Sequence, residues 1–181
     1  MKATCAVFLV LFAHQALATD ACDKLISSSL KGALAKTFPD FRTPLATDNQ
    51  EKDIEWYLRE GKSGCLGVAS GDFDGDGKND FLLGLTALRG SGALVVVALA
   101  RRTGWEFKTL GRLPEERFRL YVETGKAGVY RRSEALDGPL RPGEMEVMSC
   151  PSSAAIFGIL ESSGVAHCYV RRKWKHAWIS D

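Results

Sequence analysis

The most constraining feature of the sequence is a series of short apolar runs, from residue 64 onward, separated by turn-forming residues. One run contains Val95-Val96-Val97, and β-branched residues of this kind are enriched in strands. Gly104, Gly125 and Gly138 with Pro139 provide turns between runs. We expect mainly antiparallel strands over 66–69, 81–85, 93–100, 105–110, 118–122, 128–131, 146–150, 154–160, 165–170 and 174–179.

The region before these strands has a helical pattern. Apolar residues recur at helical spacing over 21–38, with Asp20 available as N-cap and Pro39 just past the end. A second, shorter helix is expected over 49–59, and 39–44 should be a loop. The expected fold is therefore α+β, with the N-terminal helix packed on a mainly antiparallel sheet in a single domain, 19–181. The chain has no repeat period of 20–50 residues, which argues against a solenoid or a many-bladed propeller.

Residues 1–18 have the pattern of a signal peptide. Lys2 precedes an apolar stretch over 6–13, and Ala16-Leu17-Ala18 forms an A-x-A cleavage site. The apolar stretch is shorter than the roughly 20 residues that a membrane span requires. We therefore expect a secreted or periplasmic protein without membrane insertion.

The charges are nearly balanced, with 24 lysines and arginines against 22 aspartates and glutamates. Such a chain has no strong overall field for nucleic acid or an anionic membrane, so we expect no nucleic-acid partner. We also expect a monomer. A local basic cluster over 171–175 is interpreted as a solvated hairpin face.

Four cysteines remain once the signal peptide, with Cys5, is removed. An even number in an exported chain predicts two disulfides. Three pairings are possible, and the preferred one joins Cys150 to Cys168 across a hairpin and Cys22 to Cys65. A thiol metal site is disfavoured because the chain has no C-x-x-C pair.

The segment 71–80 concentrates acidic residues in a glycine-rich loop. Asp72, Asp74, Asp76 and Asp80 occupy relative positions 1, 3, 5 and 9, and Gly77 at position 6 permits a sharp turn. A hard cation such as Ca²⁺ takes 6–8 oxygen ligands, and the carbonyl of Lys78 at position 7 could add one. The alternative is an acidic hairpin turn, because Asp-Gly pairs are common there.

This loop, Asp72 to Asp80, resembles the calcium loop of FG-GAP and VCBS repeat proteins, in which D-x-D-G-D-G-x-x-D joins two strands. The resemblance is confined to about residues 68–85. It implies that Asp72, Asp74, Asp76 and Asp80 are side-chain ligands of Ca²⁺ and Lys78 a carbonyl ligand. The family usually strings several copies into a propeller, whereas this chain has one copy, so the resemblance does not extend to the fold.

The evidence for catalysis in the sequence is weaker. His167 and His176 lie in expected strands among aromatic residues, and the chain has no H-E-x-x-H motif. Acidic candidates for a glycosidase pair are Asp53, Glu55, Glu161 and Glu115-Glu116.

We therefore expect an exported, non-enzymatic, Ca²⁺-stabilised binding module with a protein or glycan partner at the cell envelope. Trp174, Trp178 and Arg171 are candidate interface residues. The alternatives are a small envelope hydrolase and an inhibitor or immunity protein acting on a toxin or lysozyme-like enzyme.

Overall fold

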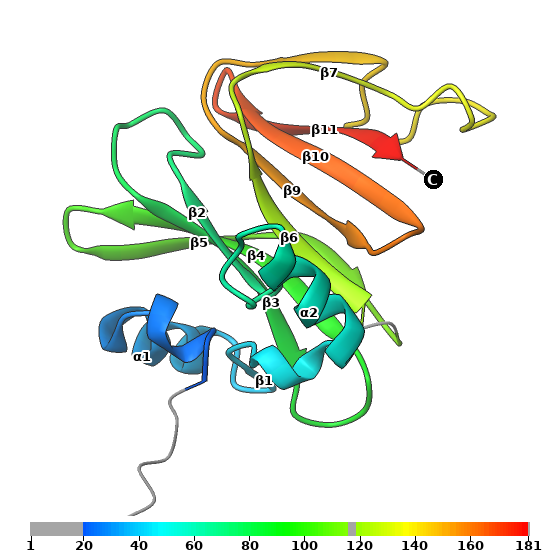
Figure 1. Ribbon diagram of the computed structural model, residues 1–181. Helices are drawn as coiled ribbons and strands as arrows, with labels where there is room; N and C mark the ends of the chain where they lie inside the picture. Colours follow the sequence, from blue (N-terminus) through cyan, green and yellow to red (C-terminus); the bar gives the residue numbers. More distant parts are fainter. Residues whose placement is uncertain (1–19, 116–118, 181) are drawn as a thin grey trace, which may run out of the picture.

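The computed structural model describes residues 20–115 and 119–180 (Figure 1). The signal peptide predicted over 1–18 lies outside the described residues. Within the described ranges, no helix combines the length and the apolar character needed to cross a membrane.

The N-terminal helical region is divided at Ser27. A 3₁₀ turn, η1 (Asp23–Leu25), precedes the helix α1 (Ser28–Thr37). Ser27 is extended, and its side chain accepts a hydrogen bond from the Leu30 amide at 3.3 Å, which makes it the N-cap. The single helix predicted over 21–38 is therefore two elements. A second 3₁₀ turn, η2 (Ala46–Asp48), leads into α2 (Glu51–Arg59), close to the predicted 49–59.

The first sheet is built around two long strands, β3 (Asp80–Ala87) and β4 (Ala93–Arg101). The outer side of β4 pairs with β5 (Gly104–Leu113). The outer side of β3 pairs with two strands in succession, β2 (Val68–Gly71) and the two-residue β1 (Phe41–Arg42). The sequence predicted a loop where β1 lies. Every pairing in this sheet is antiparallel.

The second sheet has the strand order β11-β10-β9-β6 and is also antiparallel. Its strands are β6 (Leu120–Gly125), β9 (Ala154–Ile159), β10 (Ser163–Val170) and β11 (Lys173–Ser180). A separate two-stranded sheet pairs β7 (Gly128–Arg131) with β8 (Val147–Cys150).

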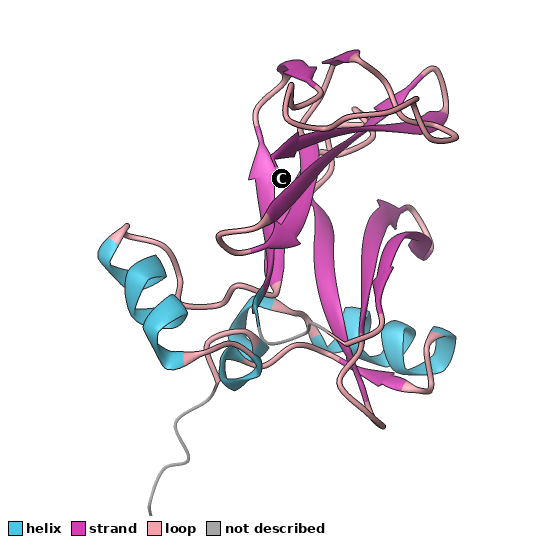
Figure 2. Cartoon of the chain, turned by 90° about the vertical axis from the view of Figure 1, so that its right-hand side faces the viewer, coloured by secondary structure: helices cyan, strands magenta, loops and turns pink. Residues whose placement is uncertain are grey.

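The core consists of three apolar clusters between successive layers. The first lies between one face of the first sheet and α1, whose Leu30 and Leu34 are buried there. The second lies between the two larger sheets and includes Val95, Val97 and Phe157. The third lies between the second sheet and the β7–β8 pair. Figure 2 shows the helices gathered toward one end of the molecule.

The predicted α+β class is wrong, because the protein is mainly β: 44% of the described residues are in strands and 16% are helical. The two α-helices are short, and the main layers are sheets. The reason lies in β4, where seven consecutive residues from Ala93 to Leu99 are buried. A strand that is apolar on both faces needs a cover on each face, and one helix can cover only one of them. The second sheet covers the other.

Both predicted disulfides are confirmed, Cys22–Cys65 and Cys150–Cys168. Their presence indicates an oxidising, extracellular or periplasmic environment. The role predicted for the second one is wrong, because Cys150 and Cys168 do not lie on the two strands of one hairpin. Cys150 belongs to β8 and Cys168 to β10, so this disulfide joins the two-stranded sheet to the second sheet.

Candidate functional site

The acidic loop connects β2 to β3, where Gly71 and Asp80 form the last pair of the ladder. Gly75 and Gly77 have φ angles of 82° and 81°. This left-handed conformation costs little for glycine and is unfavourable for other residues, so the two glycines allow the chain to fold back within the loop.

Three of the four predicted carboxylates converge. One oxygen each of Asp72, Asp74 and Asp80 lies within 4.8 Å of the others, a grouping that could hold a metal ion. Asp80 is fully buried and accepts hydrogen bonds from the amides of Phe73, at 3.0 Å, and Ala100, at 2.8 Å. Burial nevertheless raises the pKa of Asp80 above its ordinary value. A bound cation would stabilise this buried carboxylate in its charged form.

Asp72 organises the backbone of the loop. Its carboxylate accepts hydrogen bonds from the amides of Gly75 at 2.7 Å, Asp76 at 3.1 Å and Gly77 at 3.0 Å. Asp74 accepts one from Asp76 at 3.2 Å. The aspartate spacing seen in the sequence thus gives a turn in which acidic side chains point inward.

Asp76 and Lys78 lie at the edge of the loop. The Asp76 carboxylate accepts hydrogen bonds from the Lys78 ammonium at 2.6 Å and from the Lys78 amide at 2.9 Å, and these contacts lower the pKa of Asp76. Asp76 does not belong to the group of three that converge. The Asp76 carboxylate and the Lys78 carbonyl therefore stay predicted ligands.

Sequence reasoning missed the basic residue that faces this cluster. Arg101, at the end of β4, donates from Nη1 to Asp74 Oδ2 at 2.6 Å and from Nε to Glu106 Oε2 at 2.7 Å. The Asp74 side chain is only 7% exposed. Burial opposes the charge on Arg101, but Glu106 and Asp74 together raise its pKa, so the guanidinium remains charged. The only sequence signal was a basic residue at the end of an apolar run.

The loop is also attached to the second sheet. Ser153 donates its amide to the Asp72 carbonyl at 3.0 Å, and Ser152 Oγ lies 3.2 Å from the Phe73 carbonyl. Phe73 itself is fully buried in the cluster between the two larger sheets. Order in the loop is therefore coupled to packing between the sheets.

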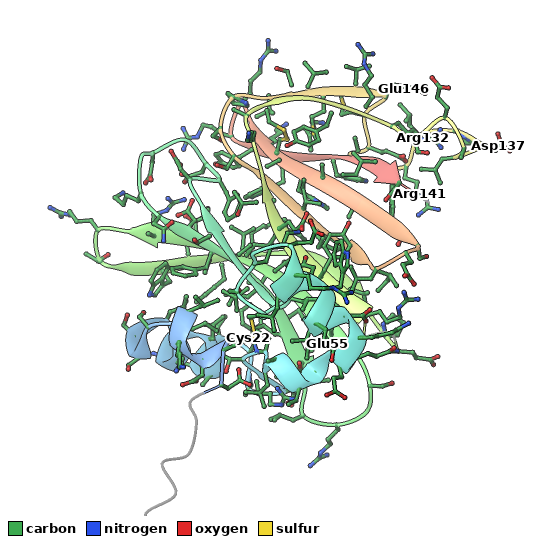
Figure 3. All side chains as sticks on the ribbon, in the orientation of Figure 1. Cys22, Glu55, Arg132, Asp137, Arg141 and Glu146 are labelled. Carbon is green, nitrogen blue, oxygen red and sulfur yellow. A yellow bond between two sulfur atoms is a disulfide. The ribbon has the colours of Figure 1, made fainter. Side chains whose placement is uncertain are left out.

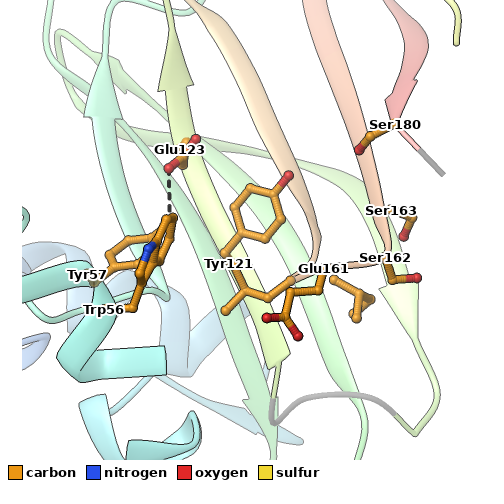
Figure 4. A pocket seen from close by; sticks show the side chains of 10 residues that line it. Trp56, Tyr57, Tyr121, Glu123, Glu161, Ser162, Ser163 and Ser180 are labelled. Atoms are coloured by element: carbon orange, nitrogen blue, oxygen red, sulfur yellow. Dashed lines mark hydrogen bonds between the residues drawn. The ribbon is translucent and has the colours of Figure 1, made fainter. Parts of the chain in front are cut away.

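A second candidate site is a groove between α2 and the second sheet (Figure 4). Its cavity of about 410 Å³ is flanked by Trp56 and Tyr57 on α2, with Tyr121 and Glu123 on β6. The Tyr57 hydroxyl donates to Glu123 Oε1 at 3.1 Å. The remaining lining residues are Ile159, Leu160, Glu161, Ser162, Ser163 and Ser180. No motif in the sequence pointed to this groove.

His167 and His176 form a stack of three rings with Phe157. His167 lies between Phe157 and His176, with ring centroids 5.2 Å away on both sides. Burial, with a smaller effect of His176, lowers the pKa of His167 to about 3, so its imidazole is neutral at ordinary pH. The three rings contribute to the wall of an apolar cavity of about 260 Å³. This arrangement is more suited to packing than to proton transfer.

The predicted interface tryptophans have a different environment. Trp174 and Trp178 pack, partly buried, against the cluster between the two larger sheets, and the Arg141 guanidinium lies 5.8 Å from the Trp178 ring centroid. Arg171 is exposed in the β10–β11 turn. Trp56, in the groove beside α2, is by contrast 43% exposed.

Comparisons of the chain with protein-family models, with curated proteins and with solved structures gave no match.

Proposed function

We propose that the protein is an exported, non-enzymatic binding module of the cell envelope, stabilised by Ca²⁺, with a protein or glycan partner. The observation that carries this proposal is the convergence of Asp72, Asp74 and Asp80 within 4.8 Å. The likeness of the loop to those of FG-GAP and VCBS repeats supports the same ion.

The chemistry of the ligands favours Ca²⁺ over transition metals. All three converging groups are carboxylates, and hard cations prefer oxygen, whereas zinc and copper sites usually contain histidine or cysteine. The carboxylate of Asp76, the carbonyl of Lys78 and water would complete a shell of 6–8 oxygens. Glycine-rich, adaptable loops suit the irregular coordination of Ca²⁺ better than the strict octahedron of Mg²⁺.

The position of the loop favours a stabilising role for the ion. The loop contacts both larger sheets through Asp80, which accepts from Ala100 on β4, and through Ser153, which precedes β9. An ion that fixed the loop would thus stabilise the packing of these sheets. Binding to the folded state alone adds to the free energy of unfolding.

Calcium titration by isothermal calorimetry tests the proposal. The mature protein, stripped of metal by a chelator, should bind one Ca²⁺, and Asp72→Asn should weaken the binding. Asp40→Asn is the matched control, because Asp40 is exposed and outside the cluster. Absence of a binding isotherm for wild type would refute the Ca²⁺ assignment.

A small envelope hydrolase is the second candidate, and one observation favours it. Asp53 and Glu161, two of the acids considered for a glycosidase pair, line the same cavity of about 450 Å³. Glu55 is exposed on α2 (Figure 3) and does not line that cavity. Product release from peptidoglycan or oligosaccharides by the wild type, abolished in Asp53→Asn and in Glu161→Gln, would establish the hydrolase instead.

A further inference from the structure

We propose that the groove between α2 and the β9–β10 turn binds a neutral, extended glycan. The inference rests on the proposed function, because it names the partner of the binding module and the surface that would hold it.

The groove consists of two cavities that share three lining residues. One has a volume of about 410 Å³ and the other about 450 Å³, and Trp56, Leu160 and Glu161 line both. Each volume lies in the range of sites for small molecules, roughly 300–1,000 Å³. Two such cavities that share a wall suit an elongated ligand with repeated units better than a single compact molecule.

Glycines on two neighbouring strands leave room for the Tyr121 phenol, which lines the first cavity. Tyr121, Gly158, Gly164 and Ser180 are paired in a row across β6, β9, β10 and β11. A Cβ atom at Gly164 would lie 2.8 Å from both Tyr121 Oη and Ser180 Oγ. The phenol therefore extends across the sheet toward Gly164, and the Tyr121 and Ser180 residues add two hydroxyl groups to the cavity lining.

Trp56 provides an aromatic surface in the middle of the groove. It is 43% exposed and packs edge to face against Tyr57, with ring centroids 5.5 Å apart. A partly exposed aromatic ring of this kind can contact the apolar C–H face of a sugar ring. Figure 4 shows Trp56 and Tyr57 on one side of the groove and Glu161, Ser162, Ser163 and Ser180 on the other.

The charges in the first cavity compensate each other. Glu123 is paired with Lys62, and Glu161 with Arg119 at 2.6 Å. Burial and the Glu123 carboxylate raise the pKa of Tyr57 and Tyr121, so both phenols are uncharged. Together with these ion-pair partners, the two cavities have nearly balanced charges. The basic side chains are Lys52, Arg59, Lys62 and Arg119, and the acidic ones are Asp53, Glu123 and Glu161. Hydrogen bonding, more than net charge, should therefore select the ligand.

One buried carboxylate oxygen beside the second cavity lacks a donor. Asp53 is 7% exposed, and within the described part of the chain its Oδ2 has no hydrogen-bond partner. A buried acceptor without a partner is costly, and a ligand hydroxyl could satisfy it after a small side-chain rotation. Hydroxyl donors on a ligand that also has apolar C–H faces are typical of sugars.

The test is binding of neutral oligosaccharides to the folded, Ca²⁺-loaded mature protein. Hexasaccharides of glucose, N-acetylglucosamine, mannose and galactose would be titrated, with Trp fluorescence and calorimetry as readouts. We expect at least one to bind, and Trp56→Ala and Glu161→Gln each to weaken it by about tenfold or more. Leu88→Ala is the control, because Leu88 is 59% exposed and outside the groove. The bound oligosaccharide should be recovered uncleaved.

Melting temperature and near-UV circular dichroism would establish that each variant is folded. Glu161→Gln changes a side chain that is 76% exposed, so it provides a test even if Trp56→Ala does not fold. The inference is overturned if no neutral hexasaccharide binds, if a polylysine peptide binds in their place, or if Glu161→Gln binds as the wild type does. Calcium calorimetry on the same samples separates this failure from a failure of the proposed function.

Discussion

Arg101 Nη1 lies 2.6 Å from Asp74 Oδ2, so the protein places one of its own cations against the acidic cluster. The same nitrogen lies 3.5 Å from Asp76 Oδ2. This contact offsets part of the repulsion among the carboxylates. The Arg101 guanidinium also competes with a metal ion for the Asp74 carboxylate. Two predictions concern this relationship.

Calcium should raise the melting temperature of the mature protein. At a hundredfold excess over Kd, an ion that binds only the folded state adds about 2.7 kcal/mol, or roughly 5–10 °C for a chain of this size. Mg²⁺ should have a smaller effect because it dehydrates reluctantly. Scanning calorimetry with Ca²⁺ and with EDTA measures the difference, which Asp74→Ala should abolish. Equal melting temperatures in both conditions would contradict a stabilising ion.

Arg101→Gln should increase the affinity for Ca²⁺ and lower the stability of the metal-free protein. Removal of one positive charge next to the site should improve the affinity by about fivefold, near 1 kcal/mol. In EDTA the variant should lose up to about 1 kcal/mol of stability, as for a partly exposed ion pair. Arg102→Gln, an exposed neighbour, is the control. Weaker Ca²⁺ binding in Arg101→Gln would mean that Arg101 supports the ion site.

His167 should make the protein less stable in mild acid. Its folded pKa is about 3 against 6.5 for the unfolded chain, so between these values the unfolded state binds more protons. The free energy of unfolding is therefore not reduced by His167 above about pH 6.5, and it decreases as the pH falls from 6.5 toward 3. Between pH 7 and pH 5 the loss should be about 2 kcal/mol.

Urea denaturation at the two pH values measures this loss. His167→Phe, which retains the stacking between Phe157 and His176, should show a much smaller decrease. His176→Phe should keep most of it, since His176 is only half-buried. An unchanged decrease in His167→Phe would show that other groups cause the acid sensitivity.

A buried ion pair holds the loop that precedes β8. Arg132 Nε donates to Glu144 Oε1 at 2.9 Å, and the Glu144 side chain is 2% exposed. Glu144 also accepts from the Arg141 amide at 2.8 Å. Figure 3 shows Arg132 and Arg141 beside the end of β11, and Ser133 donates its amide to the Trp178 carbonyl at 2.8 Å. The pair therefore fixes this loop against the second sheet.

Glu144→Gln should destabilise the protein by about 3 kcal/mol at pH 7, because it leaves the Arg132 charge buried without a counter-ion. The Arg141 amide and Arg132 lower the pKa of Glu144 below 4.5, so its contribution is present above that pH and is lost as the pH falls through the folded value. The difference from wild type should therefore shrink as the pH falls below 4.5 and through the folded pKa of Glu144. Glu146→Gln, at an exposed position, should have little effect at either pH.

Several structural features could be predicted because their signals are local. The Val95-Val96-Val97 run became the centre of β4, and the aspartate spacing from Asp72 to Asp80 became a turn with three convergent carboxylates. The even number of cysteines in an exported chain predicted two disulfides, and the short separation of Cys150 from Cys168 favoured, among three possible pairings, the one that the structure has. The interruption of the first helix at Ser27 was missed, although serine is a favoured N-cap residue.

The sequence by itself determined where most of the long strands lie and that the aspartates from Asp72 to Asp80 share one turn, although it missed β1 and did not separate Asp76 from the three that converge. These properties depend on residues a few positions apart. The tertiary structure alone decided that the strands divide into separate sheets, that Arg101 faces Asp74, that Cys150–Cys168 joins two layers, and that Trp56 stands beside Glu161. Each of these features is a contact between segments that are distant in the sequence, and such contacts form when the chain buries its apolar faces. The periodicity of a strand shows which face is apolar but does not specify which element will cover it.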